Sequence, residues 1–197
     1  MLQSRTAPVA SDLVLAPGVV LARARAHEAT GAARAVFALL AARRLTGPVV
    51  WIRSAWAAER PMADGFHAFL DPARLVFART ARPADSLWAA EEALRSGAAP
   101  LVVADLPEPP SLLAVRRLHL AAEAGALQAA DPPLALLLTP GAGGAPGIET
   151  RWRLDPAPGW NQGGDPRWRL ARTRARMAPE ASWQAWLDDG ELRLAPA

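Results

Sequence analysis

The side chains best suited to chemistry in this sequence are arginines interleaved with tryptophan towards its C-terminal end. The arginines in question are Arg167, Arg169, Arg172, Arg174 and Arg176, with Trp168 among them. Along an extended strand alternate residues share a face, so we expect the last three arginines to align, and the first two as well if no bulge intervenes. Such a row could follow a phosphate backbone while an exposed tryptophan stacks on a base. A solvated sheet face with its tryptophan in the core fits the same pattern, and both interpretations stay open.

Other tryptophans carry the same ambiguity. Arg151 and Arg153 flank Trp152 and repeat the alternation of the later segment. Most of the remaining indole rings should lie in the core, and any that are exposed would mark a surface that binds a partner, because binding hot spots favour Trp and Arg. These remaining tryptophans are Trp51, Trp56, Trp88, Trp160, Trp183 and Trp186.

The usual constellations for hydrolysis and metal binding are missing from the sequence. The chain has no cysteine, which excludes disulfides, thiolate metal sites and a cysteine nucleophile. His27, His67 and His119 are widely separated and lack metal-ligand spacing. No G-x-S-x-G elbow presents a serine nucleophile. We therefore expect neither a metal site nor a cofactor.

Arginine supplies all the positive charge of this 197-residue chain. Its 22 basic residues include no lysine, and its net charge is +3. A GC-rich coding genome accounts for such usage without any functional reason. Alternatively, the planar guanidinium serves to grip phosphates or carboxylates through two hydrogen bonds, and only local clustering separates the two explanations.

Short apolar runs indicate the strands that must position these residues. The runs are VVWI (49–52), LVFA (75–78), LVVAD (101–105) and LALLLT (134–139). Because they are apolar throughout, we expect strands that are covered on both faces. After residue 148 the sequence alternates arginine with tryptophan, leucine or alanine, which is typical of antiparallel strands with one solvated face.

Helical spacing fills the intervals between the apolar runs. The helical segments are residues 31–45, 83–97 and 110–126. Asp85 is positioned to cap the second helix, and Gly97 and Gly125 are natural helix ends. Strand and helix in alternation predict an α/β domain with a mainly parallel sheet, extended by C-terminal antiparallel strands.

In this order the segments resemble the RecA core from about residue 23 onward. The stretch PADSLWAAEEALRSGAAPLVVADLPEPPSL (83–112) resembles the family's helix and Walker B strand, which implies that Asp105 is the magnesium-associated aspartate. An aspartate that merely caps the following turn is the alternative for Asp105. Within the superfamily the chain resembles the ImuA group, with HEATGAARAVFALLAARRL as the marker segment. The resemblance implies a three-layer α/β/α core.

The phosphate-binding turn of that family is degraded here. In a working P-loop, glycine N–H groups wrap the phosphates, lysine reaches the β and γ oxygens, and Ser or Thr holds magnesium. Arg34 replaces the lysine and Ala35 the hydroxyl, while the carboxylate of Glu28 is expected to repel phosphate. The degenerate nucleotide loop comprises Glu28, Thr30, Gly31, Arg34 and Ala35. We therefore expect no ATP hydrolysis, although Arg34 could still bind a phosphate.

The resemblance implies a non-catalytic adaptor of a bacterial translesion-synthesis complex that acts in the SOS response. Its implied partners are an ImuB-type relative of the Y-family polymerases and, indirectly, an error-prone C-family polymerase, with DNA as a further candidate. A SulA-like cell-division inhibitor and a residual ATP-binding protein are the alternatives. We expect an N-terminal tail (1–12), a single RecA-like domain (13–197) and a cytoplasmic location without membrane contact, because the sequence has neither a signal-peptide pattern nor a long apolar segment.

Overall fold

The computed structural model describes residues 12–55, 63–157 and 166–197, which form an α/β fold around one large mixed sheet. The sheet has nine strands in the order β11-β10-β9-β8-β3-β7-β6-β4-β5. Most of it is parallel, as the apolar runs predict, and it ends in antiparallel strands at the C-terminal side. Most of the expected tail (1–12), together with Trp56 and Trp160, lies outside the described residues.

The parallel part of the sheet contains all the strands expected from the apolar runs. Its members are β3 (Ala26–Thr30), β4 (Val49–Ser54), β5 (Leu75–Thr80), β6 (Leu101–Asp105), β7 (Leu134–Leu138) and β8 (Thr150–Pro156). Strand β3 lies between β7 and β8 and is parallel to both. The antiparallel strands follow β8, and they are β9 (Arg167–Ala175), β10 (Ala181–Asp188) and β11 (Glu191–Pro196).

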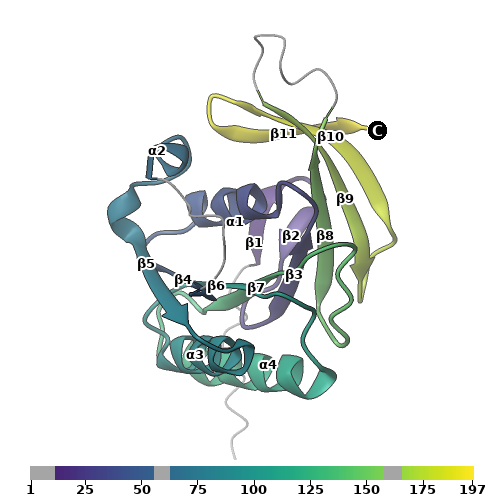
Figure 1. Cartoon of the computed structure of the whole chain (residues 1–197). Coiled ribbons are helices and arrows are strands. Elements are labelled where there is room, and N and C mark those ends of the chain that lie inside the picture. Colours follow the sequence, from purple (N-terminus) through teal and green to yellow (C-terminus); the bar gives the residue numbers. More distant parts are fainter. Residues whose placement is uncertain (1–11, 56–62, 158–165) are drawn as a thin grey trace, which may run out of the picture.

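Helices cover both faces of the sheet (Figure 1). Helix α1 (Arg34–Arg43) lies on one face, and α3 (Pro83–Ser96) and α4 (Leu112–Ala126) lie side by side on the other. The remaining short helices, α2 (Ala63–Phe66) and a 3-10 turn at Pro72–Arg74, precede β5. Burial on both faces is the arrangement that apolar parallel strands require.

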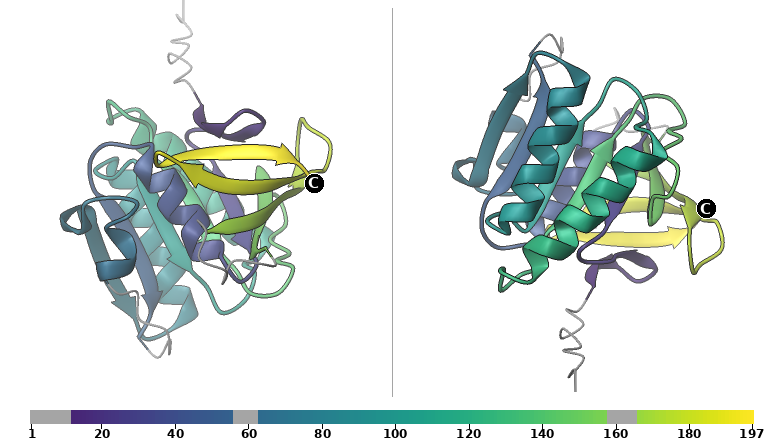
Figure 2. Two further views of the ribbon diagram at one scale, coloured as in Figure 1. Left: turned by 90° about the horizontal axis from the view of Figure 1, so that it is seen from above. Right: turned by 90° about the horizontal axis from the view of Figure 1, so that it is seen from below.

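The α1 face of the sheet holds the larger apolar cluster. A hairpin of β1 (Leu13–Ala16) and β2 (Val19–Leu21) contributes to this cluster, and so do residues of β9 to β11. Strands β10 and β11 curve over the side of α1 (Figure 2), where Arg44 forms an ion pair with Glu191 at 2.6 Å. This hairpin lies outside the apolar runs that predict the strands of the large sheet.

Three sequence expectations about element ends and burial need correction. Gly97 ends α3 with φ +65° as expected, but Asp85 lies in its first turn and binds the guanidinium of Arg82 instead of capping the helix. Gly125 does not end α4, because it lies inside the helix where a Cβ would come within 2.0 Å of the Leu94 carbonyl oxygen. It therefore allows α3 and α4 to approach closely. Strand β5, at one edge of the sheet, is not covered on both faces, because none of its residues is fully buried and three of them are exposed.

Strand β9 contains a bulge that the sequence pattern does not reveal. Arg151 of β8 pairs with Arg174, while the next residue, Trp152, pairs with Arg172, so Thr173 is the extra residue. Paired residues share a face, and a bulge reverses the face of the residues beyond it. Arg172 and Arg174 consequently lie on opposite faces, and the expected alignment of Arg172, Arg174 and Arg176 is wrong.

Candidate functional site

The turn that the sequence resemblance compares with a phosphate loop joins β3 to α1. Strand β3 continues through Thr30, and α1 begins at Arg34, so only Gly31–Ala33 form the turn. Gly31 has φ +89°, a conformation that favours glycine. Thr30 is buried, and its hydroxyl donates to the carbonyl oxygen of Trp152 at 3.2 Å. This side chain therefore serves the contact between β3 and β8.

The backbone N–H groups of this turn are bound by the end of β8. The N–H of Ala32 donates to Oδ1 of Asp155, and the N–H of Ala33 donates to the carbonyl oxygen of Leu154, both at 2.9 Å. The Arg34 N–H donates to the Gly31 carbonyl oxygen at 3.3 Å. In a nucleotide-binding turn such N–H groups point at phosphate oxygens. Here a carboxylate of the same chain takes that place.

Asp155 fits this role in both geometry and charge. A Cβ on Gly31 would lie 2.3 Å from the Leu154 carbonyl oxygen and 2.7 Å from Asp155 Oδ1, so glycine is what allows β8 to approach. The guanidinium of Arg153 donates to Asp155 Oδ2 at 2.5 Å. Partial burial raises the pKa of Asp155, but the bonds from Ala32 and Arg153 outweigh it and lower the pKa overall. The carboxylate is therefore held in its charged form.

Neither replacement residue at the start of α1 reproduces P-loop chemistry. The guanidinium of Arg34 reaches back to the carbonyl oxygen of Gly31 at 3.4 Å, so the side chain lies against its own turn. Ala35 is exposed and carries no oxygen that could hold magnesium. The turn thus has an arginine in the lysine position but lacks a metal ligand at the next residue.

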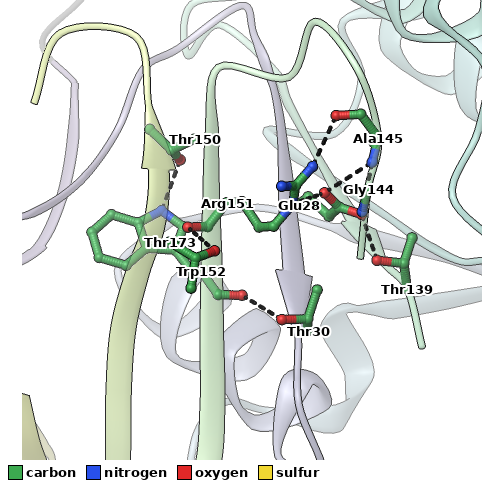
Figure 3. A network of polar contacts seen from close by, with 9 residues as sticks. All are labelled: Glu28, Thr30, Thr139, Gly144, Ala145, Thr150, Arg151, Trp152 and Thr173. Atoms are coloured by element: carbon green, nitrogen blue, oxygen red, sulfur yellow. Dashed lines mark hydrogen bonds and ion pairs between the residues drawn. The ribbon is translucent and has the colours of Figure 1, made fainter. Parts of the chain in front are cut away.

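Glu28 lies apart from the turn. It is fully buried in the middle of β3 and faces the side of the sheet covered by α4, whereas α1 lies on the opposite side. Its carboxylate accepts hydrogen bonds from the Thr139 hydroxyl at 2.6 Å and from the Gly144 N–H at 3.0 Å, and it forms an ion pair with Arg151 (Figure 3). The carboxylate therefore anchors the loop that follows β7.

Asp105 occupies the carboxyl end of β6. It stands in register with Arg53 of β4 and Leu138 of β7, so it lies at the same sheet edge as the turn after β3. Its side chain is partly exposed and has an interaction partner. Strand β7 separates β6 from β3.

The arginines of β9 do not form one surface. Arg172 lies over the rings of Trp152 and Trp183, and it donates to the carbonyl oxygens of Gly18 and Pro179 at 2.9 Å. It therefore stabilises the contact between the β1–β2 hairpin and the sheet. Arg167 lies over the ring of Trp186 at the other end of the strand. Arg169 is exposed.

Arg174 and Arg176 are brought together with other arginines beside α4. They line a groove with Arg25 and Arg116, two residues that the sequence analysis did not connect with them. The nearby pair of Arg151 and Arg153 does not join this group, because one binds Glu28 and the other Asp155.

The tryptophans that the structure describes separate into core and surface residues. Trp51 is buried, as expected, and Trp183 and Trp186 are partly covered. Trp152 and Trp168, whose position the sequence left open, are buried in the core. Trp88 on α3 is exposed.

Histidine 27 is a buried, neutral part of β3. Its Nε2–H donates to the Ala22 carbonyl oxygen at 2.9 Å, and Nδ1 accepts from the Thr150 hydroxyl at 2.7 Å. This tautomer follows from the Ala22 carbonyl oxygen, which can only accept, so Nε2 carries the proton of the neutral ring and Nδ1 is the acceptor. Burial lowers the pKa of His27 to about 4.

His119 is likewise held by backbone groups. Its Nδ1 accepts from the Ala26 N–H at 3.3 Å, and its Nε2–H donates to the Gly147 carbonyl oxygen at 3.2 Å. Burial lowers its pKa too. Within residues 12–55, 63–157 and 166–197, no three His, Asp or Glu side chains gather closely enough to hold a metal ion.

Sequence reasoning missed Asp155, the residue that decides the chemistry of the turn. It lies in the segment RWRLDP, and only the pairing of β3 with β8 brings it to Ala32.

No helix in the described ranges is long and apolar enough to cross a membrane. In comparisons with known proteins, no family model matches the chain and no curated protein resembles it significantly.

Proposed function

We propose that this chain is a RecA-like adaptor without ATPase activity, which acts by binding another protein. The observation that carries the proposal is the turn Gly31–Ala33, whose N–H groups bind Asp155 and Leu154 of the same chain. An ATP molecule would have to displace a carboxylate and would find no lysine there. Because phosphoryl transfer depends on positioning and metal electrostatics, such a turn is unsuited to hydrolysis.

The arrangement of strands supports a RecA-type core. The turn after β3 and Asp105 at the end of β6 lie at the same edge of the sheet, one strand apart, as a Walker A and Walker B pair would. Helices lie on both faces of the parallel strands. In open α/β sheets ligands usually bind at the carboxyl ends of the strands. Here the N–H groups of the turn at that end of β3 bind groups of the same chain.

The identity of the partner is proposed from the resemblance to the ImuA group alone. It would be the ImuB-type relative of the Y-family polymerases, in a cytoplasmic complex for damage-induced mutagenesis that includes an error-prone C-family polymerase. Offering the chain both this partner and the tubulin-like division protein tests the proposal, since retention of the division protein instead would favour a SulA-like inhibitor.

Nucleotide binding provides the first direct test of the turn. Magnesium-ATP should leave the melting temperature of the purified chain unchanged and should release no phosphate. In the variant Asp155→Ala the N–H of Ala32 loses its acceptor, so sulfate or phosphate should raise the melting temperature more in the variant than in the unchanged chain, where these salts act only through their general stabilising effect. The control Asp188→Ala removes an exposed carboxylate elsewhere and should behave as the unchanged chain. Magnesium-dependent phosphate release by the unchanged chain would overturn the proposal.

A further inference from the structure

A groove between α4 and the start of the β8–β9 hairpin combines positive charge with apolar side chains. Its volume is about 500 Å³. Helix α4 forms one wall, and Ile148, Arg174 and Arg176 contribute from the opposite side. The lining residues on or near the first wall include Arg25, Leu112, Arg116, His119, Leu120 and Glu123.

The cations of the groove are only partly neutralised. Arg25 forms an ion pair with Glu123, and Arg176 approaches Glu149 at 3.5 Å. In contrast, Arg116 and Arg174 form no hydrogen bond or ion pair with any residue that the structure describes. Both are exposed. The groove therefore offers two guanidinium groups to carboxylates from outside the chain.

Helix α4 adds an apolar ridge beside these cations. Leu120, which lines the groove, is 64% exposed, while Leu113 on the same helix and Leu127, which caps its C-terminal end, are 68% and 78% exposed. Their spacing of seven residues places them along one side of the helix, as in a helix that packs against another. Contiguous exposed apolar residues beside polar ones mark interaction sites.

Peptide chemistry fits this groove better than nucleic acid. A phosphate backbone needs a continuous row of cations, and the bulge at Thr173 interrupts that row. Arg172, moreover, is committed to Trp152 and Trp183 on the other face. Exposed leucines gain nothing from phosphates, but they bury well against the apolar side of a helix.

We infer that this groove binds an amphipathic helix of a partner protein, with leucine-like residues on one side and Asp or Glu flanking them. Helix α4 has 15 residues, or about 22 Å at the usual rise, so a segment of similar length can lie along it. The carboxylates bind Arg116 and Arg174, and the apolar side covers Leu120. The inference rests on the proposed adaptor function, for which it supplies the docking surface and the chemistry of the docked segment.

Selection from a displayed library of random peptides of about 15 residues, on the immobilised full chain, tests the inference. We expect enriched peptides with acidic residues and with Leu, Ile or Met at helical spacing. Their affinity, measured by fluorescence anisotropy, should fall at least about tenfold for Leu120→Asp and for the double variant Arg116→Glu with Arg174→Glu.

Matched variants control for general effects of charge and apolar loss. Trp88→Asp replaces a residue of nearly equal exposure, 62%, on the neighbouring helix, and Arg169→Glu reverses an exposed charge on β9. Neither residue lines the groove, so neither change should alter peptide affinity more than about twofold, and a larger loss in Trp88→Asp would place the peptide on the exposed tryptophan of α3 and not in the groove. Circular dichroism of every variant checks that it is folded.

Three results would overturn the inference. One is a library without enriched binders, and another is a set of binders that lack acidic residues or ignore the groove variants. The third is tight binding of a single-stranded or duplex oligonucleotide of about 20 nucleotides that depends on Arg174 but not on Leu120. If the ImuB-type partner is still retained by the groove variants, the adaptor proposal stands and the groove inference fails.

Discussion

The strand β3 with its turn and the groove beside α4 are both rich in hydrogen-bond donors and charges, yet they use them in opposite ways. In the β3 region the N–H donors of the turn bind Asp155 and the Leu154 carbonyl oxygen, and the carboxylate of Glu28 is surrounded by partners. In the groove, Arg116 and Arg174 have no partner among the described residues. The polar groups of the first region therefore stabilise the fold, and those of the second are available for binding. The first region is nevertheless the one that resembles a ligand site.

Removal of the Glu28 carboxylate should have the largest effect in the β3 region. The variant Glu28→Ala leaves Arg151, mostly buried, without its anion and deprives the Thr139 hydroxyl of an acceptor. Breaking a buried pair in this way costs about 3–5 kcal/mol. Urea unfolding measures the loss, with Glu123→Ala as the groove counterpart, which should cost at most about 1 kcal/mol because that pair is exposed. Similar losses in both variants would erase the difference between the regions.

Acid should weaken the β3 region through His27. Burial lowers the pKa of His27 to about 4, so the unfolded chain binds this proton more readily than the folded one. Stability is therefore full above the ordinary pKa of about 6.5 and falls as the pH drops towards 4, by roughly 3 kcal/mol in total. Unfolding at several pH values should show this slope, and His27→Gln should reduce it. Burial lowers the pKa of His119 in the groove as well, so part of the slope should persist in His27→Gln. An unchanged slope in His27→Gln would assign the effect elsewhere.

Loss of the groove arginines should have the smallest effect on stability. Arg116→Ala and Arg174→Ala remove exposed side chains without ion pairs among the described residues, so each should change the free energy of unfolding by at most about 0.5 kcal/mol. The same urea experiment checks this. A loss above about 1 kcal/mol would mean that the guanidinium serves the fold after all.

The apolar strands could be predicted from the sequence because their environment is uniform. Strands β6 and β7 are buried on both faces, and their boundaries follow the apolar runs closely. Strand β5 has a similar apolar run but lies at the edge of the sheet. The sequence could not predict this position, because a local pattern does not give the order of strands in a sheet. Gly125 shows the same limit, because its role depends on Leu94 of another helix.

The candidate site could be predicted only in part. The loss of lysine at Arg34 and of the hydroxyl at Ala35 is visible in the sequence itself. The role of Asp155 is not, because it depends on a strand pairing between segments more than a hundred residues apart. The bulge at Thr173 likewise changes which arginines share a face without any glycine or proline to signal it.

The tether between Asp155 and its turn has a consequence for how the molecule responds to its surroundings. Because donor and acceptor belong to one folded chain, their mutual local concentration is fixed by the fold and cannot be diluted. The ordering entropy of this contact is spent once, during folding, whereas a small anion loses its translational freedom at every encounter. The state of the turn should therefore follow the folded fraction of the protein and remain insensitive to the metabolic supply of phosphate compounds.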